Sequence, residues 1–196
     1  MANLTDPAHE FAALCRRLRP PTNTRGSDHL AELFKTDPHS DEFYQIISTI
    51  IDRANQLKVL VSKIDGTAHI ASEINNNISN ILRTFQVSHL AGQWGTHGSP
   101  HLQEDNVGPI MILSAAIRPH ISYPALTDDE RAEILQDVET LLVWLQEHQL
   151  NEQDFIREAL IEGLRQFAFR LERTQWFGWG YTFQSIKEVI GAYLAL

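Results

Sequence analysis

Histidines and carboxylates, which are residue types that bind transition metals, gather in one short stretch of this chain. His97 and His101 follow His89 closely, and Glu104 and Asp105 come soon after them. Imidazole nitrogens and carboxylate oxygens are common protein ligands of zinc and iron. His97 and His101 are therefore candidate metal ligands. The alternative is a polar surface loop that binds no metal, and under this alternative we expect no cofactor.

Arg83 and His89 form a second pair with catalytic potential, because five residues separate an arginine from a histidine. A guanidinium suits phosphate, and an imidazole transfers protons near neutral pH. The pair resembles the motif of the HEPN superfamily, all-helical ribonucleases in which four to six residues separate the two. The resemblance covers this motif and the all-helical class. It implies an RNA-cleaving site in which Arg83 contacts phosphate and His89 transfers the proton, whereas the alternative is an accidental spacing.

An aromatic, glycine-rich segment over residues 176–181 is the third candidate site, and an apolar helix is expected after it. Tryptophan and tyrosine dominate binding hot spots, and glycine lets a partner approach closely. We therefore expect this region to bind a protein partner or a second copy of the chain. The predicted partner-binding residues are Trp176, Phe177, Trp179, Tyr181, Ile190 and Tyr193. The alternative is a turn whose rings fill the gap between two helices.

Signatures of several common enzyme classes are missing from the sequence. It contains no phosphate-binding glycine loop, no Gly-x-Ser-x-Gly elbow, no His-Glu-x-x-His and no Cys-x-x-Cys. The expected function is therefore a non-catalytic helical interaction or regulatory domain. The alternatives are a HEPN-like ribonuclease that uses Arg83 and His89, and a metal-dependent hydrolase built on the 91–106 loop.

Apolar spacing near the start of the chain determines the expected fold class. Seven apolar residues recur at alternating steps of four and three, which is the spacing of one helix face. They are Phe43, Ile47, Ile50, Ala54, Leu57, Val61 and Ile64. Ser40 is a suitable cap for this helix, which we expect over about 41–64. Strand-type alternation is absent from the sequence. We therefore predict an all-α single-domain bundle of about six or seven helices with mixed or orthogonal packing.

Helix-start signals indicate an N-terminal arm. Asp6 and Pro7 predict a first helix over about 7–18, since aspartate caps helices and proline suits their first position. A proline-rich linker follows. We therefore assign residues 1–27 to an N-terminal helix and linker, and residues 28–196 to the helical bundle domain.

A capping box marks a later helix, because Thr127 precedes Glu130 by three residues at the start of an apolar repeat. It predicts a helix over about 128–149, and Asn151 is the expected cap of the next one. Residues 91–106 are expected to be irregular. The other predicted helices cover about 67–90, 107–117, 152–174 and 183–195. The apolar pattern runs to the last residue, so the sequence leaves open whether the native chain continues.

The acidic composition restricts the expected partners. The chain carries a net charge of −9, most of it in the second half. DNA binding is not expected, because nucleic-acid affinity depends on lysine and arginine, and RNA is expected only for the ribonuclease alternative. We see neither a secretory signal nor a membrane-spanning apolar run, so a cytoplasmic location without membrane binding is expected. Cys15 is the only cysteine, which excludes an internal disulfide.

Overall fold

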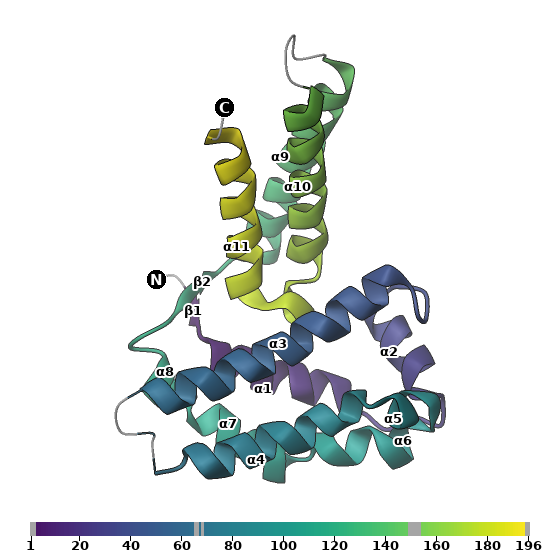
Figure 1. Ribbon diagram of the computed structural model, residues 1–196, viewed down its shortest axis with the longest axis vertical. Helices are drawn as coiled ribbons and strands as arrows, with labels where there is room; N and C mark the ends of the chain where they lie inside the picture. Colours follow the sequence, from purple (N-terminus) through teal and green to yellow (C-terminus); the bar gives the residue numbers. More distant parts are fainter. Residues whose placement is uncertain (1–2, 65–66, 68, 149–153, 195–196) are drawn as a thin grey trace. The chain divides into compact units, whose positions relative to one another are not determined.

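The computed structural model describes residues 3–64, 67, 69–148 and 154–194 of the chain. Its contacts divide the chain into two compact units. We call Leu4–Tyr123 the N-terminal unit, and Met1–Asn3 together with Pro124–Leu196 the C-terminal unit. Figure 1 shows the elements of both units. The predicted domain boundary after residue 27 stays a prediction.

Helices account for nearly all of the regular structure, which confirms the all-α class. The N-terminal unit contains α1 (Pro7–Leu18), α2 (Gly26–Phe34), α3 (Asp41–Lys63), α4 (Ala71–Leu82), α5 (Val87–Ala91), α6 (Trp94–His97), α7 (Glu104–Ile112) and α8 (Ser114–Ile117). Two 3₁₀ turns, η1 (Arg83–Phe85) and η2 (Ser99–Leu102), connect them. The C-terminal unit contains α9 (Asp128–Glu147), α10 (Asp154–Glu172) and α11 (Thr174–Leu194). The predicted count of six or seven helices is wrong, because several expected segments divide into shorter helices.

The two capped helices of the N-terminal unit form as predicted. The Asp6 carboxylate accepts hydrogen bonds from the backbone amides of Ala8 and His9 at the start of α1. The Ser40 hydroxyl accepts one from the amide of Phe43 at the start of α3. The apolar seam of α3 is buried throughout, and this helix packs against α1 and α4. The seam therefore forms much of the core of this unit.

The predicted helix over 67–90 is too long at both ends. Thr67 donates a hydrogen bond from its hydroxyl to the carbonyl of Ile64, so it closes the end of α3 and does not begin the next helix. At the other end, α4 stops at Leu82 and passes into η1. Gln86 then adopts an extended conformation with ψ of 144°. The asparagine-rich sequence of α4 has modest helix propensity, so tertiary packing determines its length.

The sequence pattern predicted an irregular loop over residues 91–106. This prediction is wrong, because the stretch folds into α6, η2 and the start of α7. The fully buried Trp94 anchors this stretch, because its indole N–H donates to the carbonyl of Leu18 at 3.0 Å. Ser99 donates to the carbonyl of Arg19 at 2.6 Å. Hydrogen bonds thus join residues 91–106 to the end of α1 and the linker that follows it. The residue spacing within either segment gives no sign of these long-range bonds.

The apolar segment over 107–117 also differs from its prediction. It forms α7, which begins at Glu104 and contains Pro109, and the separate short helix α8. It is not buried on all sides, because Ile112 is largely exposed. β1 (Asn3–Thr5) and β2 (Tyr123–Ala125) pair as a small two-stranded sheet.

In the C-terminal unit, α10 packs against both α9 and α11. The predicted capping box of Thr127 and Glu130 is present at the start of α9. The predicted cap Asn151 lies outside the described residues. Gly163 permits the close approach of α10 and α11, because a Cβ atom there would lie 2.8 Å from Cγ2 of Val189. Among the described residues of both units, no helix is sufficiently long and apolar to span a bilayer.

Candidate functional site

Three histidines that the sequence separates stack against one another on the N-terminal unit. The ring of His89 in α5 lies 5.9 Å from that of His97 in α6 and 5.1 Å from that of His101 in η2, centroid to centroid. The rings are nearly parallel, with interplanar angles of 22° and 15°. We call these three residues with Arg83 the histidine cluster. Arg83 lies in η1 and is exposed to solvent.

The backbone around the histidine cluster explains how the rings come together. Gly92 follows α5, and a Cβ atom there would lie 2.5 Å from Cδ2 of His97. A glycine at this position therefore leaves the space that the His97 ring occupies. The anchors at Trp94 and Ser99 described above hold α6 and η2 in place. The cluster thus depends on the packing of short helices, not on a regular repeat.

Partial burial affects the protonation of one ring of the histidine cluster, that of His101. Desolvation lowers the pKa of His101 below its ordinary value, and the nearby His89 and Arg83 lower it further. The Nδ1 atom of His89 is buried and has no hydrogen-bond partner among the described residues. A neutral imidazole beside an exposed guanidinium can accept a proton while the guanidinium binds an anion.

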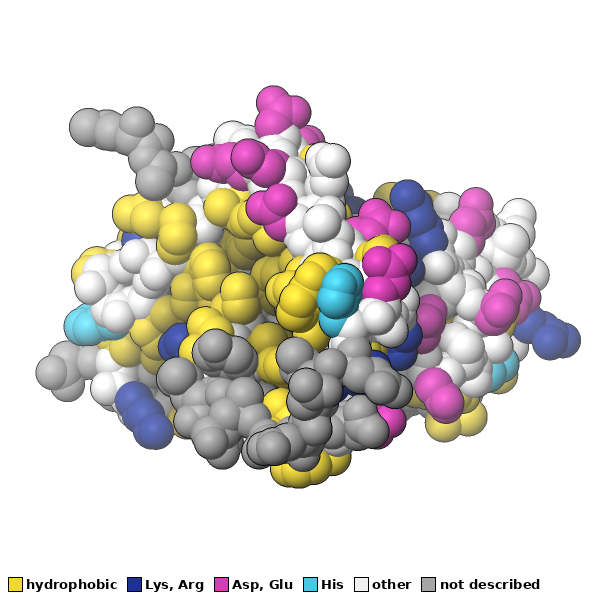
Figure 2. All heavy atoms as spheres, turned by 90° about the horizontal axis from the view of Figure 1, so that it is seen from above, with side chains coloured by type: hydrophobic (Ala, Val, Ile, Leu, Met, Phe, Trp, Pro, Cys, Tyr) yellow, Lys and Arg dark blue, Asp and Glu magenta, His cyan; other side chains and the backbone are white. Residues whose placement is uncertain are grey.

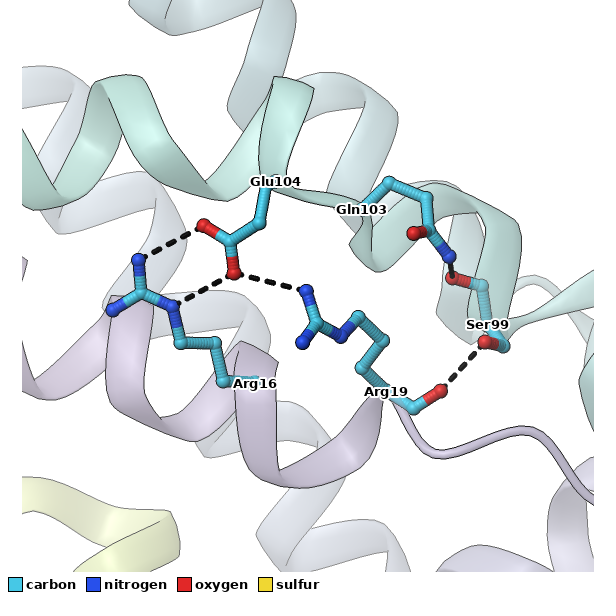
Figure 3. Close-up of polar contacts among 5 residues, drawn as sticks. All are labelled: Arg16, Arg19, Ser99, Gln103 and Glu104. Carbon is cyan, nitrogen blue, oxygen red and sulfur yellow. Dashed lines mark hydrogen bonds and ion pairs between the residues drawn. The ribbon is translucent and has the colours of Figure 1, made fainter.

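The carboxylates of the predicted metal site do not join the histidines in a ligand set. Glu104 instead accepts hydrogen bonds from Arg16 and Arg19, each at 2.9 Å (Figure 3). Within the described parts of the chain, no group of three or more His, Cys, Asp or Glu residues is arranged to hold a metal ion. Metal binding by His97 and His101 stays a prediction.

The aromatic segment near the end of the chain spans a break between two helical stretches, which together are labelled α11. It lies within α11, where Gly178 has φ of 76° and ψ of 158° and produces a kink. A side chain would strain this backbone conformation, which glycine adopts readily. Phe177 packs edge-on against Phe169 of α10, with ring centroids 5.4 Å apart. The kink thus turns aromatic rings of α11 toward α10.

The predicted partner-binding residues differ widely in exposure. Trp176, Phe177 and Trp179 are buried, Tyr181 is half-buried, and Ile190 is exposed. The side chain of Tyr193 lies outside the described residues. Burial favours the packing interpretation for the first three rings, whereas partner binding by the segment as a whole stays a prediction.

The comparisons with known proteins add no functional assignment. The chain matches no protein-family model, and neither the curated proteins nor the solved structures include a significant match. The function must therefore be inferred from the geometry of the chain itself.

One group of polar residues on the N-terminal unit is not evident from the sequence. Asp6 is fully buried and accepts hydrogen bonds from the hydroxyl of Ser114 at 2.5 Å and from Nε of Arg118 at 3.2 Å. The only available signal was the position of Asp6 as a helix cap. More than one hundred residues separate the partners, so no local spacing could link them.

Proposed function

We propose that the protein is a non-catalytic helical interaction protein whose C-terminal unit binds a protein partner or a second copy of the chain. The exposure of large hydrophobic side chains on this unit supports the proposal. Leu141 is 44%, Trp144 46%, Ile190 50% and Phe155 71% exposed. Burying such side chains in an interface removes apolar surface from water. Figure 2 shows hydrophobic side chains gathered over a broad area of the surface that it presents.

Trp144 is the strongest anchor candidate on this unit. It lies three residues after Leu141, so both side chains occupy one flank of α9. The ring of His148 stacks on the indole, with centroids 4.8 Å apart and an interplanar angle of 16°. This stacking restricts the indole before a partner arrives. An exposed tryptophan held in place loses little conformational freedom on binding, which favours a hot spot.

Acidic residues border this apolar flank. Asp137 lies one turn before Leu141 and Glu147 one turn after Trp144 on α9, and both are exposed. An apolar centre with a charged rim is the usual composition of a protein interface. The rim favours a partner surface that carries lysine or arginine. The proposed surface also includes the apolar helix α11, where Ile190 is exposed and Tyr181 is half-buried.

Light scattering after size exclusion tests the proposal, with the wild type compared at low and high concentration, alone and with extract proteins. Trp144→Ser and Ile190→Ser are expected to abolish self-association or the defined complex. Val87→Ser is the matched control, because Val87 is exposed on the N-terminal unit. A wild-type protein that is monomeric in every mixture would refute the proposal, as would equal losses in the control.

A second candidate function is RNA cleavage by Arg83 and His89, and the stacking of the histidine cluster favours it. In this proposal Arg83 binds the phosphate, and the neutral imidazole of His89 accepts the proton of the attacking ribose 2′-hydroxyl. As the bond from the 2′-oxygen to phosphorus forms, the bond from phosphorus to the 5′-oxygen breaks, and that oxygen takes a proton from water. His89→Ala and His101→Ala are expected to abolish cleavage of single-stranded or structured RNA. His120→Ala is the control, since His120 is exposed outside the cluster. Intact RNA after incubation with wild-type protein would exclude this function.

We further propose a cytoplasmic location without a DNA or membrane partner. The acidic composition supports the part of this proposal that concerns DNA. RNA is a proposed partner only for the second candidate function.

A further inference from the structure

The three helices of the C-terminal unit form an open arrangement. Among the described residues of this unit, α10 packs extensively on both α9 and α11, whereas α9 and α11 have hardly any contact with each other. In a closed four-helix bundle, each helix packs on two neighbours around a shared core. Within this unit, α9 and α11 each have one such neighbour. The burial of their side chains shows which flanks lack a second one.

α9 has more apolar surface than α10 covers. Val138 and Leu145 are buried, but Leu141 and Trp144 are exposed. Trp144 precedes Leu145 by one position, which turns its side chain about 100° around the helix from the buried side. The apolar stripe of a helix in a soluble protein usually faces the core over its whole width. The flank of α9 with Leu141 and Trp144 therefore lacks a partner within the unit.

α11 has a flank of the same kind. The side of this helix that faces α10 consists of Thr182, Ser185 and Val189. The first two are buried, and Val189 closely approaches Gly163 of α10. Each of these three residues is followed by an apolar one, and the apolar residues are Phe183, Ile186 and Ile190. They lie about 100° further around the helix. Ile190 is exposed and the other two are half-buried, so α10 does not cover this flank.

The two flanks belong to one surface, which we call the α9–α11 face. Figure 1 shows α9 and α11 running in the same direction beside α10. In α9 the uncovered Trp144 precedes a buried position, and in α11 the uncovered Ile190 follows one. Flanks on opposite sides of the buried stripes of two parallel helices can border one shared surface. Figure 2 looks down on these helices and shows hydrophobic side chains gathered between them.

The charges beside this face select the partner. α9 carries seven carboxylates and one arginine, and this arginine, Arg131, pairs with Asp128. The exposed Asp137 and Glu147 border the uncovered flank, and no described residue forms an ion pair with either of them. A second copy of the chain would bring another α9 with the same carboxylates to the interface, and juxtaposed like charges disfavour such pairing. Lysine or arginine on a different protein would complement these two carboxylates.

The spacing of the carboxylates favours a helical partner. Asp137 and Glu147 are ten positions apart, which is about 15 Å along the axis of α9. A partner helix of roughly three to four turns spans this length. Amphipathic helices commonly bind by laying their apolar side along an apolar surface of this kind.

We infer that the α9–α11 face binds a basic amphipathic helix of another protein, with the apolar side of that helix on Trp144 and Ile190 and its lysines or arginines beside Asp137 and Glu147. This inference rests on the proposed function of the C-terminal unit, and it specifies the partner as a basic helix instead of a second copy.

Fluorescence anisotropy with synthetic peptides tests this inference. The probe is a labelled peptide of about 18 residues, or roughly 27 Å as a helix, in which leucines recur at helical spacing and lysines fill the other positions. A second peptide has glutamate in place of lysine, and a third has the composition of the probe in an order without helical periodicity. The probe should bind saturably at one site. The other two peptides should bind at least about tenfold more weakly.

Two pairs of variants locate the binding surface. Trp144→Ser should weaken probe binding about tenfold or more. Val143→Ser is its control, because Val143 is exposed on the opposite side of α9 from Leu141. Glu147→Gln should weaken binding about two- to fivefold. Glu139→Gln removes the same charge from the opposite side of the same helix and should leave binding unchanged.

The outcomes separate this inference from the proposed function. A protein that is monomeric in every mixture of the light-scattering experiment refutes the proposed function. A protein that forms a complex there, but does not bind the probe or binds either other peptide equally well, overturns this inference alone. Self-association that Trp144→Ser abolishes also overturns it, because the second copy is then the occupant. Equal losses within either pair of variants would place the peptide elsewhere and overturn it as well.

Discussion

Gly98→Ala should destabilise the N-terminal unit, because the buried ring of Trp94 leaves no space for a methyl group at this position. A Cβ atom at Gly98 would lie 2.9 Å from Cδ2 of Trp94 and still closer to two other carbons of the same ring. Trp94 is fully buried and hydrogen-bonded to Leu18, so its ring cannot move without loss. The φ of Gly98 is −88°, so the substitution adds no backbone strain and tests packing alone.

The magnitude of the effect follows from two opposing contributions. Overpacking of a tight core costs about 1–3 kcal/mol. Replacing glycine by alanine recovers about 0.4–1 kcal/mol, since the unfolded chain loses conformational freedom. The expected net loss in the free energy of unfolding is therefore about 1–2 kcal/mol.

Urea unfolding followed by far-ultraviolet circular dichroism measures this loss. The midpoint concentration should fall while the m-value stays constant. Gly108→Ala is the matched control, because it lies inside α7 and its Cβ atom would make only an ordinary van der Waals contact, 3.9 Å from Oε2 of Glu104. The control should be stabilised by about 0.5–1 kcal/mol. If Gly98→Ala is as stable as Gly108→Ala, the described packing of Trp94 against this backbone is wrong.

Three other predictions concern single groups. Burial raises the pKa of the Cys15 thiol to about 12, so a thiol reagent at pH 8 should label the unfolded protein and leave the folded protein unlabelled. Desolvation lowers the folded-state pKa of His101, so its stabilising contribution is complete above about pH 6.5 and declines as the pH falls below it. The difference in urea midpoint between wild type and His101→Gln should therefore shrink between pH 7.5 and 5.5, and a constant difference would contradict this. Thr127→Ala removes the cap of α9 and should cost about 1 kcal/mol, whereas Thr140→Ala in the same helix should be neutral or stabilising in the same urea assay.

Local sequence signals predicted the elements that local interactions determine. Asp6, Ser40 and Thr127 bind amides within three residues, so each helix start was visible in the sequence. The seam of α3 was visible for the same reason, since its period arises within one helix. These signals were sufficient to establish the all-α class.

Contacts between distant segments were not predictable from one sequence. The indole of Trp94 and the carbonyl of Leu18 are 76 positions apart. The local sequence of the linker or of residues 91–106 therefore could not predict the structure of either segment. The histidine cluster was partly visible, because Arg83, His89, His97 and His101 are near in sequence. Their stacking depends on the buried anchors of α6 and η2, which no spacing rule describes.

Site-specific photo-crosslinking can show whether the C-terminal unit is an interaction surface. A photoreactive phenylalanine derivative replaces Trp144 in one sample and the control residue Val87 in another, and mass spectrometry identifies the products. We expect one dominant product at position 144, either a defined protein or the C-terminal unit of a second copy, and only background at position 87. The same weak, unspecific products at both positions would contradict it.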